Sequence, residues 1–224
     1  MQPSRYSSNA VLAGALCWMA SAEFFVAQAI TRAAWPEYSM TAHDISLLGA
    51  TTCGPTIDPA TSQIFVVCSP LHWLMNSGFI LLGLLTLSGA ILTRDAWPRG
   101  RFAGSALTLL AIGAIGPIVV GIWPLDTNNA LHAAGALLHF IFASIGIVLL
   151  GIVLFPQRRL LGLFTLLCGL LSFVCFFLYA GGIHLGLGRG GMERLAGHPS
   201  TIWLMVIGMA IWLNWRRGRR PLVS

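Results

Sequence analysis

Residues 123–155, WPLDTNNALHAAGALLHFIFASIGIVLLGIVLF, decide the fold class of this chain. The segment begins with a short polar link and continues as an apolar run, and a membrane-spanning helix needs about 20 such residues. His132 lies at the start of the apolar run, and His139 lies two turns further along. Polar side chains inside a membrane-spanning segment are costly and usually face a cavity or a partner. The segment therefore predicts a membrane helix with a polar, functional face.

The rest of the chain has the same apolar character. Of its 224 residues, 56% are hydrophobic and 9% are charged, and the mean hydropathy is +0.79. Soluble domains carry about 25% charged residues, so the composition is that of a membrane protein. We expect six membrane spans, at residues 11–30, 71–92, 102–123, 131–155, 160–183 and 201–215. The sixth span is short unless Pro199 and Ser200 begin it.

The arginines predict the orientation in the membrane. If the N-terminus is cytoplasmic, Arg32, Arg189 and Arg194 lie outside and the other ten of the 13 cationic residues lie inside, which is a strong positive-inside bias. The ten inner residues are Arg5, Arg94, Arg99, Arg101, Arg158, Arg159, Arg216, Arg217, Arg219 and Arg220. We therefore expect an all-α polytopic bundle of six transmembrane helices with both termini cytoplasmic. It forms a single domain over residues 1–224, with an extracytoplasmic loop at about residues 32–70.

Two alternatives concern the first span and the partner of the protein. The first span could be a cleaved signal peptide, because Ala27-Gln28-Ala29 resembles a cleavage site, but a retained helix is the preferred interpretation. The pI near 9.6 raises the question of nucleic acid. We exclude that partner because the arginines form short clusters between apolar runs, where membrane topology explains them. The expected partner is the lipid bilayer.

The loop at residues 32–70 contains Cys53 and Cys68. Two cysteines on the outer face of a membrane meet an oxidising compartment, so we expect them to form a disulfide. Residues 63–67 between them are strand-like. Metal binding by the two thiols is the less favoured alternative, because neither a C-x-x-C motif nor suitably spaced histidines are present.

Three spans carry polar groups at similar depths. At about 1.5 Å per residue, Glu23 lies ~13 Å, His139 ~12 Å and Asn76 ~9 Å from the outer boundary. We expect these groups to converge in one cavity in the outer half, the alternative being independent scatter. Glu193 and Arg194 are expected in a glycine-rich outer loop, residues 181–198, as a polar lid or as solvated charges.

Four blocks of the chain are similar to blocks of one known family: Tyr38-Ser39 with Ile45-Ser46 and Gly49; Cys53 with Cys68-Ser69-Pro70, His72 and Asn76; Trp123-Pro124 with Asp126 and His132; and Gly191-Met192-Glu193-Arg194. Over nearly its whole length the chain resembles domain-of-unknown-function family 998, six-helix membrane proteins of bacteria and archaea. The resemblance implies the fold and a multi-pass protein of the plasma membrane, but no established activity. The chain departs from the family pattern at Leu47, where the family has an acid, and Asp44 is the nearest substitute.

Our leading functional hypothesis is a binding protein whose outward-opening, partly polar cavity holds a lipid, an isoprenoid or another small amphiphile. The candidate ligand-binding residues are Glu23, His72, Asn76, Asp126, His132, His139, Glu193 and Arg194.

The second hypothesis is a membrane-embedded enzyme that uses acid–base or metal chemistry on a lipid-like substrate. Its candidate catalytic residues are Glu23, Asp44, Asp126 and His132, and the weak candidate metal ligands are His72 and His132. A transport or accessory subunit is the third hypothesis. The sequence does not identify a cofactor.

Overall fold

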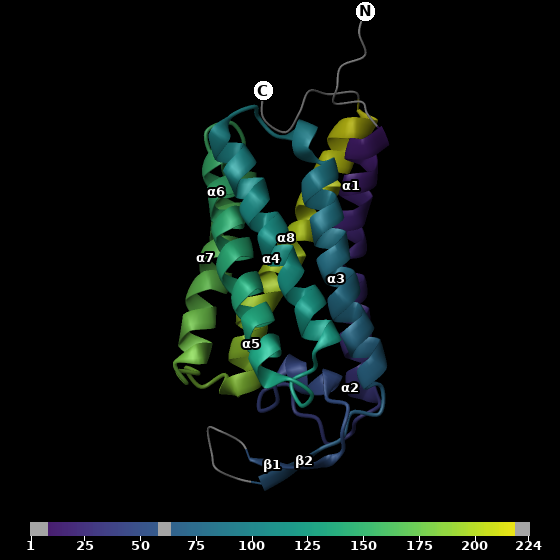
Figure 1. The fold of residues 1–224 in the computed structure, drawn as a ribbon. Coiled ribbons are helices and arrows are strands. Elements are labelled where there is room, and N and C mark those ends of the chain that lie inside the picture. Colours follow the sequence, from purple (N-terminus) through teal and green to yellow (C-terminus); the bar gives the residue numbers. More distant parts are fainter. Residues whose placement is uncertain (1–8, 58–63, 218–224) are drawn as a thin grey trace, which may run out of the picture.

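The computed structural model describes residues 9–57 and 64–217, which form a bundle of antiparallel helices (Figure 1). Six helical segments in this part of the chain are long and apolar enough to cross a membrane. They are Asn9–Ala33, His72–Leu92, Arg101–Ile122, Asn129–Leu154, Arg159–Ala180 and Gly188–Arg216. The predicted all-α, six-span fold is confirmed. The expectations for Arg5, Gln63, Arg219 and Arg220 concern residues outside the described ranges.

The bundle has two different ends. At one end, which we call the loop end, α2, α4 and α7 finish and the segment between α2 and α3 folds over the helices (Figure 1). At the other end, which we call the opposite end, α1 begins and α8 finishes. The first span begins and the last span finishes at the same end because the number of spans is even and consecutive spans run in opposite directions.

The first span consists of two helices, α1 (Asn9–Ala20) and α2 (Glu23–Ala33). Between them the chain tightens into short turns, in which the Ser21 N–H donates to the Trp18 carbonyl (3.3 Å) and the Ala22 N–H donates to the Met19 carbonyl (3.2 Å). Such tight turns in a membrane helix are tolerated where neighbouring helices cover them. Glu23 is the first residue of α2, so it lies directly at the break.

The second and third spans are α3 (His72–Leu92) and α4 (Arg101–Ile122), joined through the short helix η3 (Arg94–Ala96). Their backbones approach closely through glycine. A Cβ atom on Gly121 would lie 2.4 Å from the Asn76 carbonyl oxygen, and one on Gly83 would lie 2.6 Å from the Ala114 carbonyl oxygen. Small residues at such contacts are the usual means by which membrane helices pack.

The fourth span is not one regular helix. It consists of α5 (Asn129–Leu137), the π-helical segment η4 (Leu138–Ala143) and α6 (Ser144–Leu154). π-Helical turns inside α-helices are rare and occur frequently at functional sites. His139 lies within this turn, so its side chain direction differs from that expected of a continuous α-helix.

The last two spans are α7 (Arg159–Ala180) and α8 (Gly188–Arg216). The prediction of a short sixth span and a preceding loop was wrong, because α8 has 29 residues and includes Glu193 and Arg194. The first turn of α8 packs on the segment after α2, where the Gly190 N–H donates to the Thr41 carbonyl (2.8 Å). This contact, and the pairing of its charges described below, explain why so polar a stretch is helical.

The segment between α2 and α3 contains the short helix η2 (Ile45–Gly49) and an antiparallel hairpin of β1 (Gly54–Ile57) and β2 (Ile64–Val67). Gly54 is paired with Val67, and the adjacent Cys53 and Cys68 form the predicted disulfide. The strand expected at residues 63–67 is confirmed for the described residues 64–67. The hairpin lies beyond the helix ends (Figure 1).

Candidate functional site

A cavity of about 350 Å³ lies among the helices at the loop end. Its walls come from α2, η2, α3, α4, the fourth span, α7 and α8, so residues distant in sequence meet there. Four lining residues, Asn129, Ala133, Leu137 and Ala180, are exposed, so the cavity reaches the surface between α5 and α7. A second cavity of about 430 Å³ lies beside it under the hairpin, and Asp44 and Arg189 line both.

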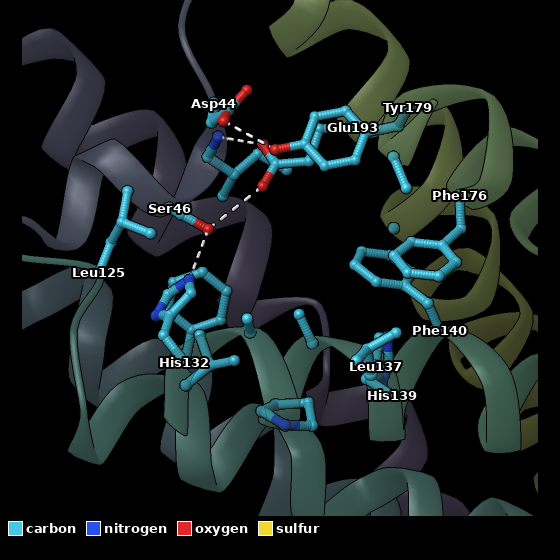
Figure 2. Close-up of a pocket in the computed structure, with 18 of the residues that line it drawn as sticks. Asp44, Ser46, Leu125, His132, Leu137, His139, Phe140, Phe176, Tyr179 and Glu193 are labelled. Atoms are coloured by element: carbon cyan, nitrogen blue, oxygen red, sulfur yellow. Dashed lines mark hydrogen bonds between the residues drawn. The ribbon is translucent and has the colours of Figure 1, made fainter. Parts of the chain in front are cut away.

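Polar and apolar groups occupy different parts of the first cavity (Figure 2). In the view of Figure 2, Asp44, Ser46, Glu193 and Tyr179 lie along one side, and Phe140 and Phe176 face them from another. The rings of Phe140 and Phe176 are stacked with centroids 4.8 Å apart. Phe24 and Phe79 form a second aromatic pair in the wall, at 5.2 Å. The cavity is therefore amphipathic.

Asp44, Tyr179 and Arg189 form a closed polar group. Asp44 Oδ2 accepts hydrogen bonds from Arg189 Nε (2.8 Å) and from the Tyr179 hydroxyl (2.7 Å). Arg189 Nη2 also donates to the Tyr179 oxygen (2.6 Å). The Asp44 side chain is only 8% exposed. A buried carboxylate is tolerated when it is paired and hydrogen-bonded, and here the pair joins the segment after α2 to the start of α8.

A second polar chain runs through Glu193, Ser46 and His132 (Figure 2). One oxygen of Glu193 accepts the Ile45 backbone N–H, and the other lies 3.2 Å from Ser46 Oγ. Ser46 Oγ lies 3.0 Å from His132 Nε2, and His132 Nδ1 lies 3.1 Å from the Trp123 carbonyl oxygen. His132 is 5% exposed. Because both of its ring nitrogens have partners, the ring is held in one orientation.

Arg194 belongs to the support of the site. Its guanidinium donates to the carbonyl oxygens of Met40 (2.7 Å) and Gly190 (2.8 Å) and to the Tyr38 hydroxyl. Burial raises the pKa of Tyr38 above its ordinary value, although Arg194 acts in the other direction. The Tyr38 hydroxyl therefore stays protonated, and it lies 2.9 Å from the Asp44 carbonyl oxygen. These bonds hold the segment that carries Asp44 and Ser46 against α8.

The structure brings only part of the predicted residues to this cavity. Of the candidate ligand-binding residues, His132, His139 and Glu193 line it, and so does Asp44 from the catalytic candidates. The others are not among its lining residues: Glu23, His72, Asn76, Asp126 and Arg194.

The expected meeting of Glu23, Asn76 and His139 in one cavity does not occur. Asn76 Nδ2 donates to the Gly49 carbonyl (2.9 Å), so that amide fixes η2 to α3. The Glu23 carboxylate lies beside α3 at Gly78, where an added Cβ would be 3.6 Å from Oε2. His139 lines the cavity, and its Nε2 lies 3.5 Å from Ser200 Oγ. Similar predicted depths therefore did not imply a common direction.

Asp126 fixes two loops to each other. Its Oδ2 accepts four hydrogen bonds of 2.8–2.9 Å, from the backbone N–H and the hydroxyl of both Thr51 and Thr52. Burial acts to raise its pKa, but the bonds from Thr52 and Thr51 outweigh that effect and hold the pKa below 3.8. Asp126 therefore joins the link before α5 to the chain that follows η2.

Three residues of the site were missed as candidates from the sequence: Ser46, Tyr179 and Arg189. Arg189 and Glu193 are four residues apart, a spacing that places two side chains on one face of a helix. That signal was hidden because the stretch was expected to be a loop. Ser46 stood inside a family block, and Tyr179 stood in a mildly polar stripe of its helix.

The metal candidates gain no geometric support. Within residues 9–57 and 64–217, no three His, Cys, Asp or Glu side chains are grouped closely enough to hold a metal ion. Both ring nitrogens of His132 have hydrogen-bond partners, and His72 does not line the cavity.

Six apolar spans around a half-buried polar site define a multi-pass integral membrane protein. Residues 11–210 match the family described as "Protein of unknown function (DUF998)", and the chain belongs to that family. The resemblance seen in the sequence is confirmed. No curated protein and no solved structure matches the chain.

Proposed function

We propose that this protein binds a small amphiphile, such as a lipid or an isoprenoid, in the cavity at the loop end. The observation that carries the proposal is the division of the cavity into a polar part around Asp44, Ser46 and Glu193 and an aromatic part around Phe140 and Phe176. An amphiphile has the same division. Its chain gains roughly 25 cal/mol for each Å² of apolar surface removed from water.

The size and position of the cavity support the same proposal. Ligand pockets usually measure about 300–1,000 Å³ and are commonly formed between the helices of bundles, and this cavity has a volume of about 350 Å³. It reaches the surface between α5 and α7, where the lining residues Leu137 and Ala180 are exposed. A ligand can therefore pass sideways from the surrounding lipid without crossing the polar loops.

The ligand site is tested best by filling it. Ala136 lines the cavity from α5, whereas Ala134 on the same helix is exposed and is not a lining residue. We expect native mass spectrometry of the purified wild type and of Ala134→Phe to show the same co-purified lipid-like mass. Ala136→Phe should lose it. Retention of that ligand by Ala136→Phe, or no ligand in the wild type and no thermal stabilisation across a lipid panel, contradicts the proposal.

We also propose that the loop end faces the extracytoplasmic side of a bacterial or archaeal plasma membrane, with both termini cytoplasmic. In this arrangement residues 1–224 form one domain, and residues 32–70 form its outer loop. Two features support this: the excess of arginine at the opposite end, and the Cys53–Cys68 disulfide, which is typical of an oxidising compartment.

The orientation has a direct test. Glu37 at the loop end and Arg158 at the opposite end are both exposed. In intact cells, a membrane-impermeant maleimide should label Glu37→Cys and should leave Arg158→Cys unlabelled until the membrane is broken. The reverse pattern overturns the proposed orientation.

A second candidate is an enzyme that acts on a lipid-like substrate, and the contact between Ser46 Oγ and His132 Nε2 (3.0 Å) favours it. A hydroxyl next to a histidine that is itself oriented by a third group is the arrangement of an activated nucleophile. Here the third group is the Trp123 carbonyl. Such an enzyme would label with a fluorophosphonate at Ser46, and Ser46→Ala would abolish labelling whereas Ser172→Ala would not. Absence of wild-type labelling rejects this candidate.

A further inference from the structure

We infer that the head group held in this cavity is uncharged and carries hydroxyl groups, as in an alkylglycerol. The inference rests on the proposed function, because it concerns the ligand of the same site. It is carried by the charges of the six titratable side chains that line the cavity, which are Asp44, His132, His139, Tyr179, Arg189 and Glu193.

The first charge pair cancels directly. Asp44 and Arg189 are joined through Oδ2 and Nε at 2.8 Å, and the Tyr179 hydroxyl bonds to both. The Tyr179 hydroxyl donates a hydrogen bond to the carboxylate, so it keeps its proton and is neutral. One negative and one positive charge are therefore held together, and the group has no net charge.

The second pair cancels because the hydrogen bonds leave room for only one shared proton. The Trp123 carbonyl can only accept, so His132 Nδ1 carries a proton. Ser46 has one hydroxyl proton for two neighbours, His132 Nε2 and a Glu193 oxygen. If that proton bonds to His132, Glu193 must be protonated to bond to Ser46. If it bonds to Glu193, His132 must be protonated instead.

Both arrangements have the same total charge. The pair is either neutral His132 with neutral Glu193, or positive His132 with negative Glu193, and the sum is zero. Any other proton count leaves a contact between two acceptors or between two donors, which is unfavourable at these part-buried contacts. The hydrogen-bond geometry therefore favours a total charge of zero for Glu193, Ser46 and His132 together.

The remaining charges do not change the total at the cavity surface. His139 lies beside Phe140, with ring centroids 5.4 Å apart, and forms no ion pair with any described residue. A charged ring there would be buried without compensation, so the neutral form is favoured. Arg194 is directed to backbone carbonyls and to Tyr38, and it does not line the cavity.

A polar site with no net charge discriminates against a charged head group. An ion that enters must lose its water and finds no opposite charge that is not already paired. Hydroxyl groups suit the site better, because they both donate and accept. Asp44 Oδ1 is buried and has no hydrogen-bond partner within the described part of the chain, so the polar side still lacks a donor. The cavity is about 350 Å³. At about 30 Å³ for each group of the size of water, it encloses roughly a dozen non-hydrogen groups.

The experiment compares three amphiphiles with the same octyl chain: octylglycerol, octyl phosphate and octyltrimethylammonium. The protein is held in amphipol, because detergent would compete for the cavity, and affinity is measured from thermal stabilisation and native mass spectrometry. We expect octylglycerol to bind about tenfold or more tightly than either ion. A wild type that prefers octyl phosphate or octyltrimethylammonium overturns this inference and leaves the proposed function intact. Binding of none of the three overturns both.

Variants turn the charge argument into a change of preference. Asp44→Asn leaves Arg189 unpaired and should raise the affinity for octyl phosphate about tenfold, whereas Arg189→Gln should do the same for octyltrimethylammonium. The double variant restores a total of zero and should prefer octylglycerol again. The control is Glu37→Gln, which removes the same charge as Asp44→Asn. Glu37 is exposed and lies outside the cavity, so this variant should not change the preference. If the preferences of the folded single variants equal those of the wild type, the inference is wrong.

Discussion

The two ends of the bundle are built in different ways. At the opposite end, Trp18 and Trp203 are completely buried with ring centroids 5.4 Å apart, and each indole N–H has a partner, Thr86 O or Thr165 Oγ1 at 3.1 Å. At the loop end, polar side chains from distant segments surround a cavity. Close packing stabilises a fold, and a cavity sacrifices part of that stability for binding. Under the proposed function, the opposite end supports the fold and the loop end holds the ligand.

The largest expected effect is at the opposite end, where the aromatic side chains are closely packed. Trp18→Ala should lower the free energy of unfolding by about 3–5 kcal/mol, because it removes a fully buried aromatic side chain. Chemical unfolding in mixed micelles, followed by circular dichroism, measures the loss. Trp73→Ala is the control, because Trp73 is 58% exposed and should cost little. Equal losses in the two variants would remove the packing contrast on which the comparison depends.

The disulfide is the main covalent restraint of the loop end. Cys53 and Cys68 are separated by 15 residues, and closing such a loop contributes about 3 kcal/mol in the chain-entropy model. We expect the Cys53→Ser/Cys68→Ser variant to lose roughly that amount, and addition of reductant should change the stability of the wild type but not of the variant. Cys17→Ser is the control, since Cys17 is a free cysteine. If reductant lowers the stability of both proteins equally, the restraint lies elsewhere.

Filling substitutions should have opposite signs at the two ends. Ala15 is completely buried at the opposite end, so Ala15→Leu should destabilise the protein by about 1–3 kcal/mol. Ala136 lines the cavity, so Ala136→Leu should stabilise the ligand-free protein by about 0.5–2 kcal/mol while it weakens ligand binding. Thermal unfolding after delipidation measures both. Destabilisation by Ala136→Leu would indicate that the cavity is occupied by protein in solution.

The fold was predictable from the sequence because a membrane span is a local property. Hydropathy over some 20 residues identifies a span whatever it packs against, and two cysteines in one loop have few other partners. Hydropathy fails for the first turns of α8. Arg189, Glu193 and Arg194 make that stretch polar, but their charges are satisfied by Asp44, Ser46 and backbone carbonyls from the segment after α2. Only the tertiary structure shows this compensation.

The sequence predicted a depth for the polar groups of the spans, but it could not predict the directions of their side chains. The rise of a helix gives the level of Glu23 and His139 directly. The break before Glu23 and the π-helical turn at His139 alter the rotation of each side chain, and neither has a proline at that position. The turn at His139 accompanies a close approach of backbones, since a Cβ on Gly116 would lie 2.4 Å from the Gly135 carbonyl oxygen. Such packing depends on a second helix and cannot be read from one segment.

The smallest expected effect concerns Asp126, which holds the loops over the cavity without touching it. Its pKa is lowered in the folded protein, so the carboxylate stabilises the fold above its unfolded pKa, near 3.8, and this contribution is lost as the pH falls through the lower folded value. Because Asp126 is exposed, solvent screens the interaction, and we expect less than about 1 kcal/mol. Hydrogen exchange of the Thr51 and Thr52 amides at pH 6 and at pH 3 measures it. Protection of these two amides should fall on acidification in the wild type and should be low at both pH values in Asp126→Ala. Protection in Asp126→Ala that equals the wild type at pH 6 would show that the loops are held by other contacts, and the loop end would then owe its order to the disulfide and to Arg194.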